Sequence, residues 1–258
     1  MTPPVFLVEP AGLAGAVAGA TVRLEGPEGR HAVTVRRLSV GEAISLVDGQ
    51  GRRIVGRVSA VIGKQALDVR VEVVEDEPAE PLRIVVVQAL PKGDRGDLAV
   101  ELLTEVGVDE IVPWAAENCI THWRGDRAAK SHQRWVVASR AAGKQSRRSR
   151  FPTMAPLATT DQVAQRVAAA DLAVVLHEGA VQGIGDLAVP PHGEVVVVVG
   201  PEGGISAAEL AAFAEAGGDP LRLGRSVLRT SSAGIAAVAA LSAHTARWNP
   251  SWEDDSHE

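Results

Sequence analysis

Three glycine-containing loops carry the residues best suited to hold a ligand. They read "LHEGA" (176–180), "GPEGGIS" (200–206) and "LGRSVLRTSSAG" (223–234), and each follows a strand-like apolar run. Glycine lets a backbone adopt positive φ angles and approach a ligand closely. Such loops offer N–H and C=O groups rather than side chains, which suits the edges of an adenine ring. A helix-entry turn would explain any one of them alone, but three together favour a ligand pocket.

The middle loop matches no common phosphate-binding pattern. A Walker loop requires a Lys after its last glycine, and no Lys follows Gly204. A dinucleotide-binding turn requires the spacing G-x-G-x-x-G, which Gly200, Gly203 and Gly204 do not have. A small-molecule nucleotide enzyme would need such a loop, or metal-binding acids, and is therefore disfavoured.

The elements that must position these loops alternate between strand and helix. The continuous apolar run "RIVVVQAL" (83–90) is typical of a parallel strand covered on both faces. Ser206 and Glu209 form a capping box that predicts a helix start. The remaining predicted strands are 108–114, 172–177, 195–199 and 221–224, and the predicted helices are 97–107, 127–143, 160–170, 206–217 and 232–247. This order predicts an α/β domain with a mainly parallel sheet, whose strands present the three loops at their carboxyl ends.

The first part of the chain has a different pattern. Residues 1–75 contain short alternating runs separated by turn signals such as Asp48-Gly49, at the spacing of a small β-barrel or sandwich. The acidic segment "EDEPAEP" (75–81) holds two prolines and reads as a linker. We therefore expect a small β domain over 1–75 and an α/β domain over 82–248, followed by a disordered tail "EDDSHE".

Composition and charge narrow the function classes. The chain has 258 residues and a net charge of −6, yet nine basic residues and one acidic residue lie between positions 124 and 150. This local charge of +8 is typical of a polyanion-binding patch, although a solvated helix face would also explain it. A single cysteine suits a reducing cytosol, and neither a signal peptide nor an 18-residue apolar stretch is present, so we expect no membrane span. Cys119, His122 and His132 have no fourth ligand at useful spacing, so we expect no metal site.

The motifs resemble the RsmE family of SPOUT-superfamily RNA methyltransferases. "LHEG", "GPEGGIS" and "LGRSVLRT" are similar to the three knot loops of that superfamily. "HAVTVRRLSVGE" (31–42) and the Asp48-Gly49 pair resemble the family's PUA-like barrel, "LPKGDRGDLAVELLTEVGVDEIVPW" the start of its catalytic domain, and "KQSRRSRFP" (144–152) its basic loop. The chain departs from the family at Ser231, where a glutamate is common, and at Lys144, which begins a segment that often starts "EQ".

The resemblance implies an activity, a cofactor and partners. The expected activity is methylation of N(3) of a uridine in small-subunit (16S) ribosomal RNA by S-adenosylmethionine, in the cytoplasm. The expected fold is a PUA-like β-barrel followed by an α/β domain with a deep trefoil knot, a rare exception to unknotted topology, and a homodimer formed through the knot region. The implied cofactor-binding residues are Leu176, His177, Glu178, Gly179, Gly200, Pro201, Glu202, Gly203, Leu223, Gly224, Val227, Leu228 and Thr230.

Methyl transfer to an imino nitrogen also requires control of charge. The uracil proton must leave, and the negative charge spreads onto the flanking carbonyl oxygens, so a guanidinium nearby would favour the anion. Arg229 is the first candidate and Arg37 the second, although a phosphate contact explains Arg37 better. Glu178, Glu202, His177 or solvent could accept the proton, and the base stays unassigned.

The expected RNA contacts are basic residues on the barrel and in the basic loop. They are Arg36, Arg37, Lys144, Gln145, Arg147, Arg148 and Arg150. Phosphate contacts of this sort position a substrate without reading its sequence. Two alternatives stay open: a SPOUT methyltransferase acting on another RNA position, and a non-catalytic RNA-binding protein whose loops hold no cofactor.

Overall fold

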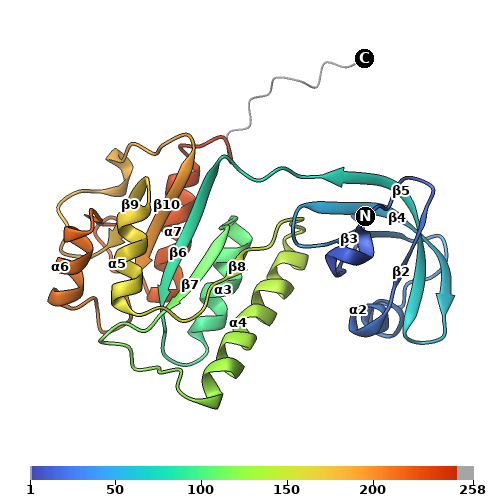
Figure 1. The fold of residues 1–258 in the computed structure, drawn as a ribbon, viewed down its shortest axis with the longest axis horizontal. Helices are drawn as coiled ribbons and strands as arrows, with labels where there is room; N and C mark the ends of the chain where they lie inside the picture. Colours follow the sequence, from blue (N-terminus) through green and yellow to red (C-terminus); the bar gives the residue numbers. More distant parts are fainter. Residues whose placement is uncertain (1, 249–258) are drawn as a thin grey trace. The chain divides into compact units, whose positions relative to one another are not determined.

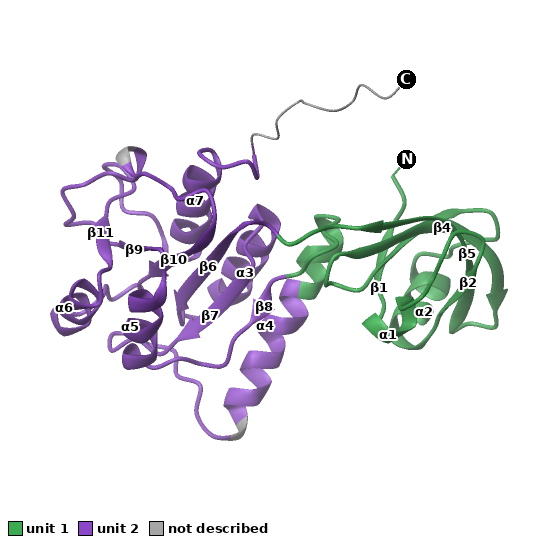
Figure 2. Cartoon of the chain, turned by 45° about the horizontal axis from the view of Figure 1, so that its top comes forward, with its two compact units in different colours: residues 1–79, 140–151 green, residues 80–139, 152–258 purple. Residues whose placement is uncertain are grey.

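The computed structural model describes residues 2–248, apart from the side chains at 126 and 186, and forms two compact units. One unit contains residues 2–79 together with 140–151, and the other contains 80–139 together with 152–248 (Figure 2). The expected disordered tail lies outside the described residues.

The first unit is built on a five-stranded sheet. Its strands and helices are β1 (Val5–Leu7), α1 (Pro10–Leu13), β2 (Thr21–Leu24), α2 (Gly26–Arg30), a π-helical turn (His31–Val35), β3 (Ala43–Val47), β4 (Arg52–Ile62) and β5 (Ala66–Asp76). The strand order is β1-β3-β4-β5-β2, in which only the β1–β3 pair is parallel. Alternating residues such as Phe6, Leu46, Ile54 and Leu67 are buried, which explains the alternating runs in the sequence.

The basic pair Arg36 and Arg37 follows the π-helical turn. Arg37 has a φ of 55°, a left-handed conformation that is uncommon for residues other than glycine. The amides of Arg36 and Leu38 donate to the carbonyls of His31 and Ala32, so the helical segment ends at this pair. Both arginines are exposed on the first unit.

The basic segment 140–151 belongs to the first unit, although the sequence motif suggested the catalytic domain. Lys144 pairs with Glu28 at 2.5 Å, and the Arg150 guanidinium donates to the carbonyl oxygens of Glu77 and Pro78. The carbonyl of Arg147 accepts a hydrogen bond from Arg53 at 2.6 Å. These contacts join positions far apart in the sequence, so local patterns did not reveal them. The two units divide between residues 79 and 80, within the segment expected to be a linker.

The second unit confirms the predicted α/β architecture. Its elements are β6 (Leu82–Ala89), α3 (Arg95–Val106), β7 (Glu110–Trp114), α4 (Asp126–Gln145, of which residues 140–145 belong to the first unit), β8 (Thr153–Met154), α5 (Thr160–Ala169), β9 (Leu172–Leu176), a short 3-10 turn (Ile184–Asp186), β10 (Gly193–Val199), α6 (Ala207–Glu215), β11 (Asp219–Leu221) and α7 (Thr230–Ser242). Six strands pair in the order β11-β9-β10-β6-β7-β8, and every pair is parallel.

The valine run of β10 lies in the middle of this sheet. Residues 195–199 are at most 1% exposed because α3 and α7 cover one face and α5 and α6 cover the other (Figure 1). β10 lies between β6 and β9, although both of these strands precede it in the chain. Strand order therefore reverses next to β6, the kind of position at which open α/β sheets bind ligands.

Two element boundaries differ from expectation for identifiable reasons. The strand expected at 221–224 is β11, at 219–221, and it includes Pro220 because an edge strand tolerates a residue without an N–H. The helix expected at 232–247 begins at Thr230, with Arg229 at its N-cap. By contrast, the capping box of Ser206 and Glu209 is confirmed. The helix expected to end at position 107 is closed there by Gly107 in a left-handed conformation.

Ion pairs join the amino ends of the central strands. Glu110, at the start of β7, accepts hydrogen bonds from Arg83 of β6 and from Arg166 of α5. Arg83 also pairs with Glu194 of β10 at 2.6 Å. Glu110 is only 8% exposed, so the four charges compensate one another in a partly desolvated cluster.

Candidate functional site

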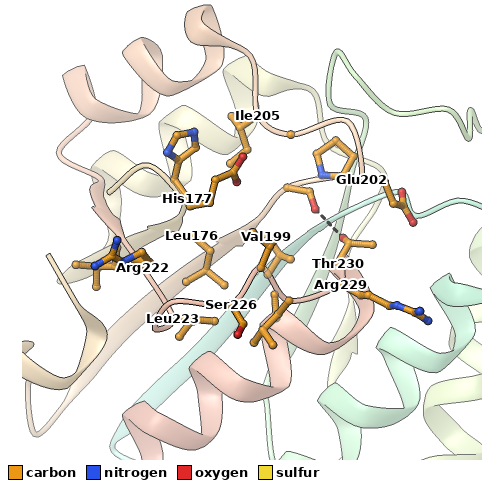
Figure 3. A pocket seen from close by; sticks show the side chains of 18 of the residues that line it. Leu176, His177, Val199, Glu202, Ile205, Arg222, Leu223, Ser226, Arg229 and Thr230 are labelled. Carbon is orange, nitrogen blue, oxygen red and sulfur yellow. Dashed lines mark hydrogen bonds between the residues drawn. The ribbon is translucent and has the colours of Figure 1, made fainter. Parts of the chain in front are cut away.

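One cavity lies beyond the carboxyl ends of β9, β10 and β11. Its volume is about 420 Å³, and the three glycine-containing loops line it together with Arg95 (Figure 3). Because the three strands are parallel neighbours or near neighbours, their carboxyl ends meet at one edge and bring residues 176–178, 200–205 and 221–230 together. The spatial meeting of the loops is therefore as the sequence predicted.

Most of the residues expected to hold a cofactor line this cavity. They are Leu176, His177, Glu178, Gly200, Pro201, Glu202, Leu223, Gly224, Val227, Leu228 and Thr230. Gly179 instead lines a second, mostly apolar cavity against α6, which shares His177 with the first. Gly203 packs against Asn118, at the back of the loop.

The backbone of the 200–206 loop is held by hydrogen bonds from Asn118 and shaped by two of its glycines. The Asn118 side-chain amide donates to the carbonyl oxygens of Gly203 and Gly204, at 3.3 and 3.1 Å. A Cβ on Gly203 would lie 2.9 Å from the Asn118 Cβ, so only glycine allows this approach. Gly204 has a φ of 76°, which turns the chain toward α6. The Asn118 hydrogen bonds and the two glycines together determine the conformation of this loop.

Glu202 connects this loop to the segment before α3. Its carboxylate accepts hydrogen bonds from the Lys92 amide at 3.2 and 3.3 Å, and Arg95 lies 3.6 Å away. Both oxygens of the carboxylate face the Lys92 amide, so Glu202 links the second loop to the segment before α3.

Glu209 anchors the start of α6 beneath the same loop. Glu209 is 4% exposed. Its carboxylate accepts hydrogen bonds from the amides of Glu117 (2.8 Å) and Ser206 (3.0 Å) and from the Thr160 hydroxyl (3.0 Å). The Thr160 hydroxyl also accepts from the Trp114 indole at 3.2 Å. The end of β7 and the starts of α5 and α6 are thereby tied together. The sequence revealed only the capping box in this network.

The second and third loops are joined by a hydrogen bond at the cavity wall. The Thr230 hydroxyl donates to the Gly200 carbonyl at 2.6 Å, drawn as a dashed line in Figure 3. The Gln88 side-chain amide in turn donates to the Thr230 hydroxyl at 3.1 Å. Sequence reasoning missed Gln88, and the only signal for it was a polar residue inside an otherwise apolar strand.

His177 is held by its own loop. Its Nδ1 accepts a hydrogen bond from the Gly179 amide at 3.1 Å, and its backbone amide donates to Leu221 at 3.0 Å. With Nδ1 acting as an acceptor, a neutral ring carries its hydrogen on Nε2. Nδ1 is therefore occupied by the Gly179 amide.

Arginine side chains surround the opening. Arg95, Arg222, Arg225 and Arg229 all line the cavity, and their charges favour a polyanionic substrate there. Within the described part of the chain, the Arg229 guanidinium has no hydrogen bond or ion pair, whereas Arg95 lies near Glu202. Arg229 is exposed and sits at the N-cap of α7, next to Thr230.

The other candidate residues lie in the first unit. Arg36, Arg37, Gln145 and Arg147 are exposed, whereas Lys144 and Arg150 are engaged within the unit as described above. Arg148 is partly buried and also has an interaction partner.

Cys119 is buried behind the site. It is 5% exposed, and burial raises the pKa of its thiol above the ordinary value. Among the described residues no group of three or more His, Cys, Asp or Glu side chains is placed to hold a metal ion. Across residues 2–248, none of the helices has the length and apolar character needed to cross a membrane.

Two family models match the chain. Residues 78–242 match a model described as an RNA methyltransferase domain, and residues 24–72 match an RNA methyltransferase PUA domain. These regions correspond to the α/β unit and the five-stranded unit, except that residues 140–151 of the five-stranded unit fall within the first match.

Relatives with names and structures match over nearly the full length. A ribosomal RNA small subunit methyltransferase E of Mycobacterium bovis is 42% identical, with 92% of this chain and 91% of the relative covered. The protein of the same name from Bacillus subtilis is 26% identical over 87% of this chain and 91% of the relative. The Neisseria gonorrhoeae protein of that name, solved bound to S-adenosyl methionine, superposes with a TM-score of 0.81 at 28% identity, covering 94% and 98% of the two chains. A methyltransferase of Legionella pneumophila, also solved with this cofactor, gives 0.84 at 28% identity, covering 95% and 99%.

Proposed function

Because the chain belongs to the family of ribosomal RNA small subunit methyltransferases E, we propose that it methylates small-subunit (16S) ribosomal RNA with S-adenosylmethionine. The family, the fold class and the class of enzyme are those that the three loop motifs predicted. The target within the RNA is proposed to be N(3) of a uridine. The observation that carries the proposal is the cavity built from all three loops at one edge of the sheet.

The residues around this cavity fit the cofactor. S-adenosylmethionine combines an adenine ring, which needs apolar walls and backbone hydrogen bonds, with a sulfonium that supplies the methyl group. Leu176, Val199, Ile205 and Leu223 provide apolar surface, and the backbone of residues 200–204 provides polar groups. A volume of about 420 Å³ lies within the usual range for pockets of this type. The cofactor-binding residues named from the sequence are proposed on this basis.

Arg229 is the residue we propose to stabilise the reacting base. Its exposed guanidinium lies at the cavity and is not committed to another group of the described chain. Placed beside a uracil carbonyl oxygen, it would stabilise the negative charge that forms as the imino proton leaves. Because Glu202 is engaged by Lys92 and His177 Nδ1 by Gly179, we assign the proton to Glu178, which lines the cavity, or to solvent.

The first unit is proposed to hold the RNA. Arg36, Arg37 and Arg147 present exposed cations on it, and contacts with phosphates would position the substrate without reading its sequence. Arg37 is therefore assigned to a phosphate contact rather than to chemistry. Lys144 and Arg150 are assigned to holding the basic segment in place, because their charged groups already have partners.

The proposal also includes a knotted topology, a homodimer and a cytoplasmic location. The insertion of β10 between two earlier strands supports a trefoil knot through the loops that line the cavity. We propose a homodimer formed through this region, which light scattering on the purified protein would test. Because ribosomal RNA is its substrate, the protein is proposed to act in the cytoplasm.

Transfer of labelled methyl from S-adenosylmethionine tests the function directly. Purified small ribosomal subunits that lack their own methylation serve as substrate, with naked 16S ribosomal RNA and transfer RNA in parallel, and the labelled nucleoside is identified by mass. Label recovered as 3-methyluridine from small-subunit RNA is the expected result. Label in another nucleoside would contradict the proposed target. No label, together with no cofactor binding by calorimetry, would contradict the proposed enzyme and leave an RNA-binding protein.

A further inference from the structure

Gln88 is a fully buried polar residue that lies behind the cavity. It occupies the carboxyl end of β6, where its neighbours along the strand are valine, alanine and leucine. Its amide nitrogen donates to the Thr230 hydroxyl and to the Ala89 carbonyl, both at 3.1 Å. Both hydrogens of the amide are therefore used, and the orientation of the amide group is fixed.

This orientation determines the direction of the next hydrogen bond. A hydroxyl has one hydrogen, and Thr230 accepts from Gln88, so its own hydrogen is free to point to the Gly200 carbonyl. The 2.6 Å separation from that carbonyl agrees with this arrangement. The result is a directed chain from β6 through the start of α7 to the second loop.

The same orientation leaves one atom of Gln88 unsatisfied. Its side-chain oxygen is buried and meets no hydrogen-bond donor among the described residues. Burying an unpaired acceptor is unfavourable, and an apolar side chain of similar length would fill this position without that penalty. Folding alone therefore gives no reason for an amide at this position, whereas the hydrogen bond to Thr230 does.

We propose that Gln88 is a positioning residue for the cofactor cavity. It orients the Thr230 hydroxyl so that the second and third loops are held together before the cofactor binds. This inference rests on the proposed function, since it concerns the affinity of the same cavity for S-adenosylmethionine. Gln88 itself is not among the residues that line the cavity, so it acts through Thr230 and Gly200.

Four variants test the proposal. Gln88→Met removes the donor and keeps a similar length, Thr230→Val removes the hydroxyl and keeps the shape, and Thr230→Ser keeps the hydroxyl as a matched control. The double variant Gln88→Met/Thr230→Val completes a double-mutant cycle. Calorimetry gives the Kd for S-adenosylmethionine, thermal unfolding of the cofactor-free protein gives Tm, and methyl transfer gives KM and kcat.

Gln88→Met should weaken cofactor binding without lowering the stability of the protein. Gln88→Met should raise the Kd about fivefold to tenfold, and raise KM for the cofactor more than it lowers kcat, while Tm stays the same or rises. Thr230→Val should weaken binding at least as much, Thr230→Ser should lose less affinity than Thr230→Val because it keeps the hydroxyl, and the double variant should bind no worse than Thr230→Val.

Four results would overturn the inference. Wild-type affinity in Gln88→Met, or additive effects in the double variant, would show that Gln88 does not act through Thr230. A loss of affinity that only follows a loss of Tm would indicate a purely structural role. If the wild-type protein itself does not bind S-adenosylmethionine, the proposed function fails as well, and this outcome is distinguishable because it precedes every comparison among variants.

Discussion

The two edges of the parallel sheet are built in opposite ways. At the amino edge, side-chain charges are paired with one another, as in the cluster around Glu110, and in the ion pair between Arg247 and Asp109. At the carboxyl edge, glycines and hydrogen bonds to backbone groups, including those of the Glu202 and Glu209 carboxylates, hold the loops around a cavity. The Arg229 guanidinium beside this cavity is not paired within the described chain, so its charge is left for a substrate.

Removing the Arg229 guanidinium should give the largest effect, and it should lower catalytic activity without lowering stability. In Arg229→Ala, kcat should fall about 100-fold or more, because a cation that stabilises developing negative charge is lost. Tm should change little, since the guanidinium has no partner among the described residues. Single-turnover methyl transfer and thermal unfolding measure the two quantities. Arg229→Lys, which keeps the charge, should retain more activity, and equal losses in both variants would contradict the electrostatic role.

A change at the amino edge should lower the stability of the fold and leave cofactor affinity nearly unchanged. Glu110→Gln leaves Arg83 and Arg166 without their shared carboxylate, which should lower the free energy of unfolding by about 2 kcal/mol. For a domain of this size, Tm should fall by about 4–8 °C. The Kd for S-adenosylmethionine should stay within about twofold of wild type at a temperature where both proteins are folded. A large change in affinity would mean that the two edges are not independent.

Adding a side chain at Gly203 in the second loop should reduce cofactor affinity more than it reduces the free energy of unfolding. In Gly203→Ala, the new Cβ would meet Asn118 at 2.9 Å, so the 200–204 backbone must move. We expect about a tenfold rise in the cofactor Kd and a loss of about 1 kcal/mol in stability. Gly185→Ala is the matched control, because a Cβ there meets nothing within 4 Å. The prediction is contradicted if both variants bind the cofactor equally well.

The smallest effect concerns the buried thiol at the carboxyl edge. Burial raises the pKa of Cys119 in the folded state, so the unfolded thiol ionises at a lower pH. Its contribution to stability is therefore complete below the unfolded pKa of about 8.5 and is lost as the pH rises toward the folded value. Urea unfolding at pH 8 and pH 10 should show a decrease larger by up to about 1 kcal/mol in wild type than in Cys119→Ala. Identical pH profiles for the two proteins would contradict this.

Much of the α/β unit could be predicted because its signals are local. The valine run, the capping box at Ser206 and the cap at Gly107 each depend on a few neighbouring residues. The order of strands and helices followed from these patterns. The meeting of the three loops followed in turn, because parallel strands share their carboxyl edge.

What the sequence did not reveal depends on distant contacts. Gln88 matters only because Thr230, 142 positions later, begins a helix beside it. Arg150 was expected to contact RNA, yet its guanidinium binds carbonyls near residue 77. Glu202 was a candidate base, and its partner Lys92 lies 110 positions earlier. Residue type gave the chemical capability in each case, and the tertiary structure determined its use.

The position of β10 also constrains how the protein is made. On the ribosome, β6 and β9 are synthesised before the strand that must lie between them. Until residues 193–199 have emerged, β6 lacks one of its final neighbours, and β9 lacks both because β11 is synthesised later still. Such open edges are prone to pair with other chains. Completion of the sheet must therefore wait for late synthesis, and its high contact order makes folding slow. We expect nascent chains truncated before β10 to require chaperone protection.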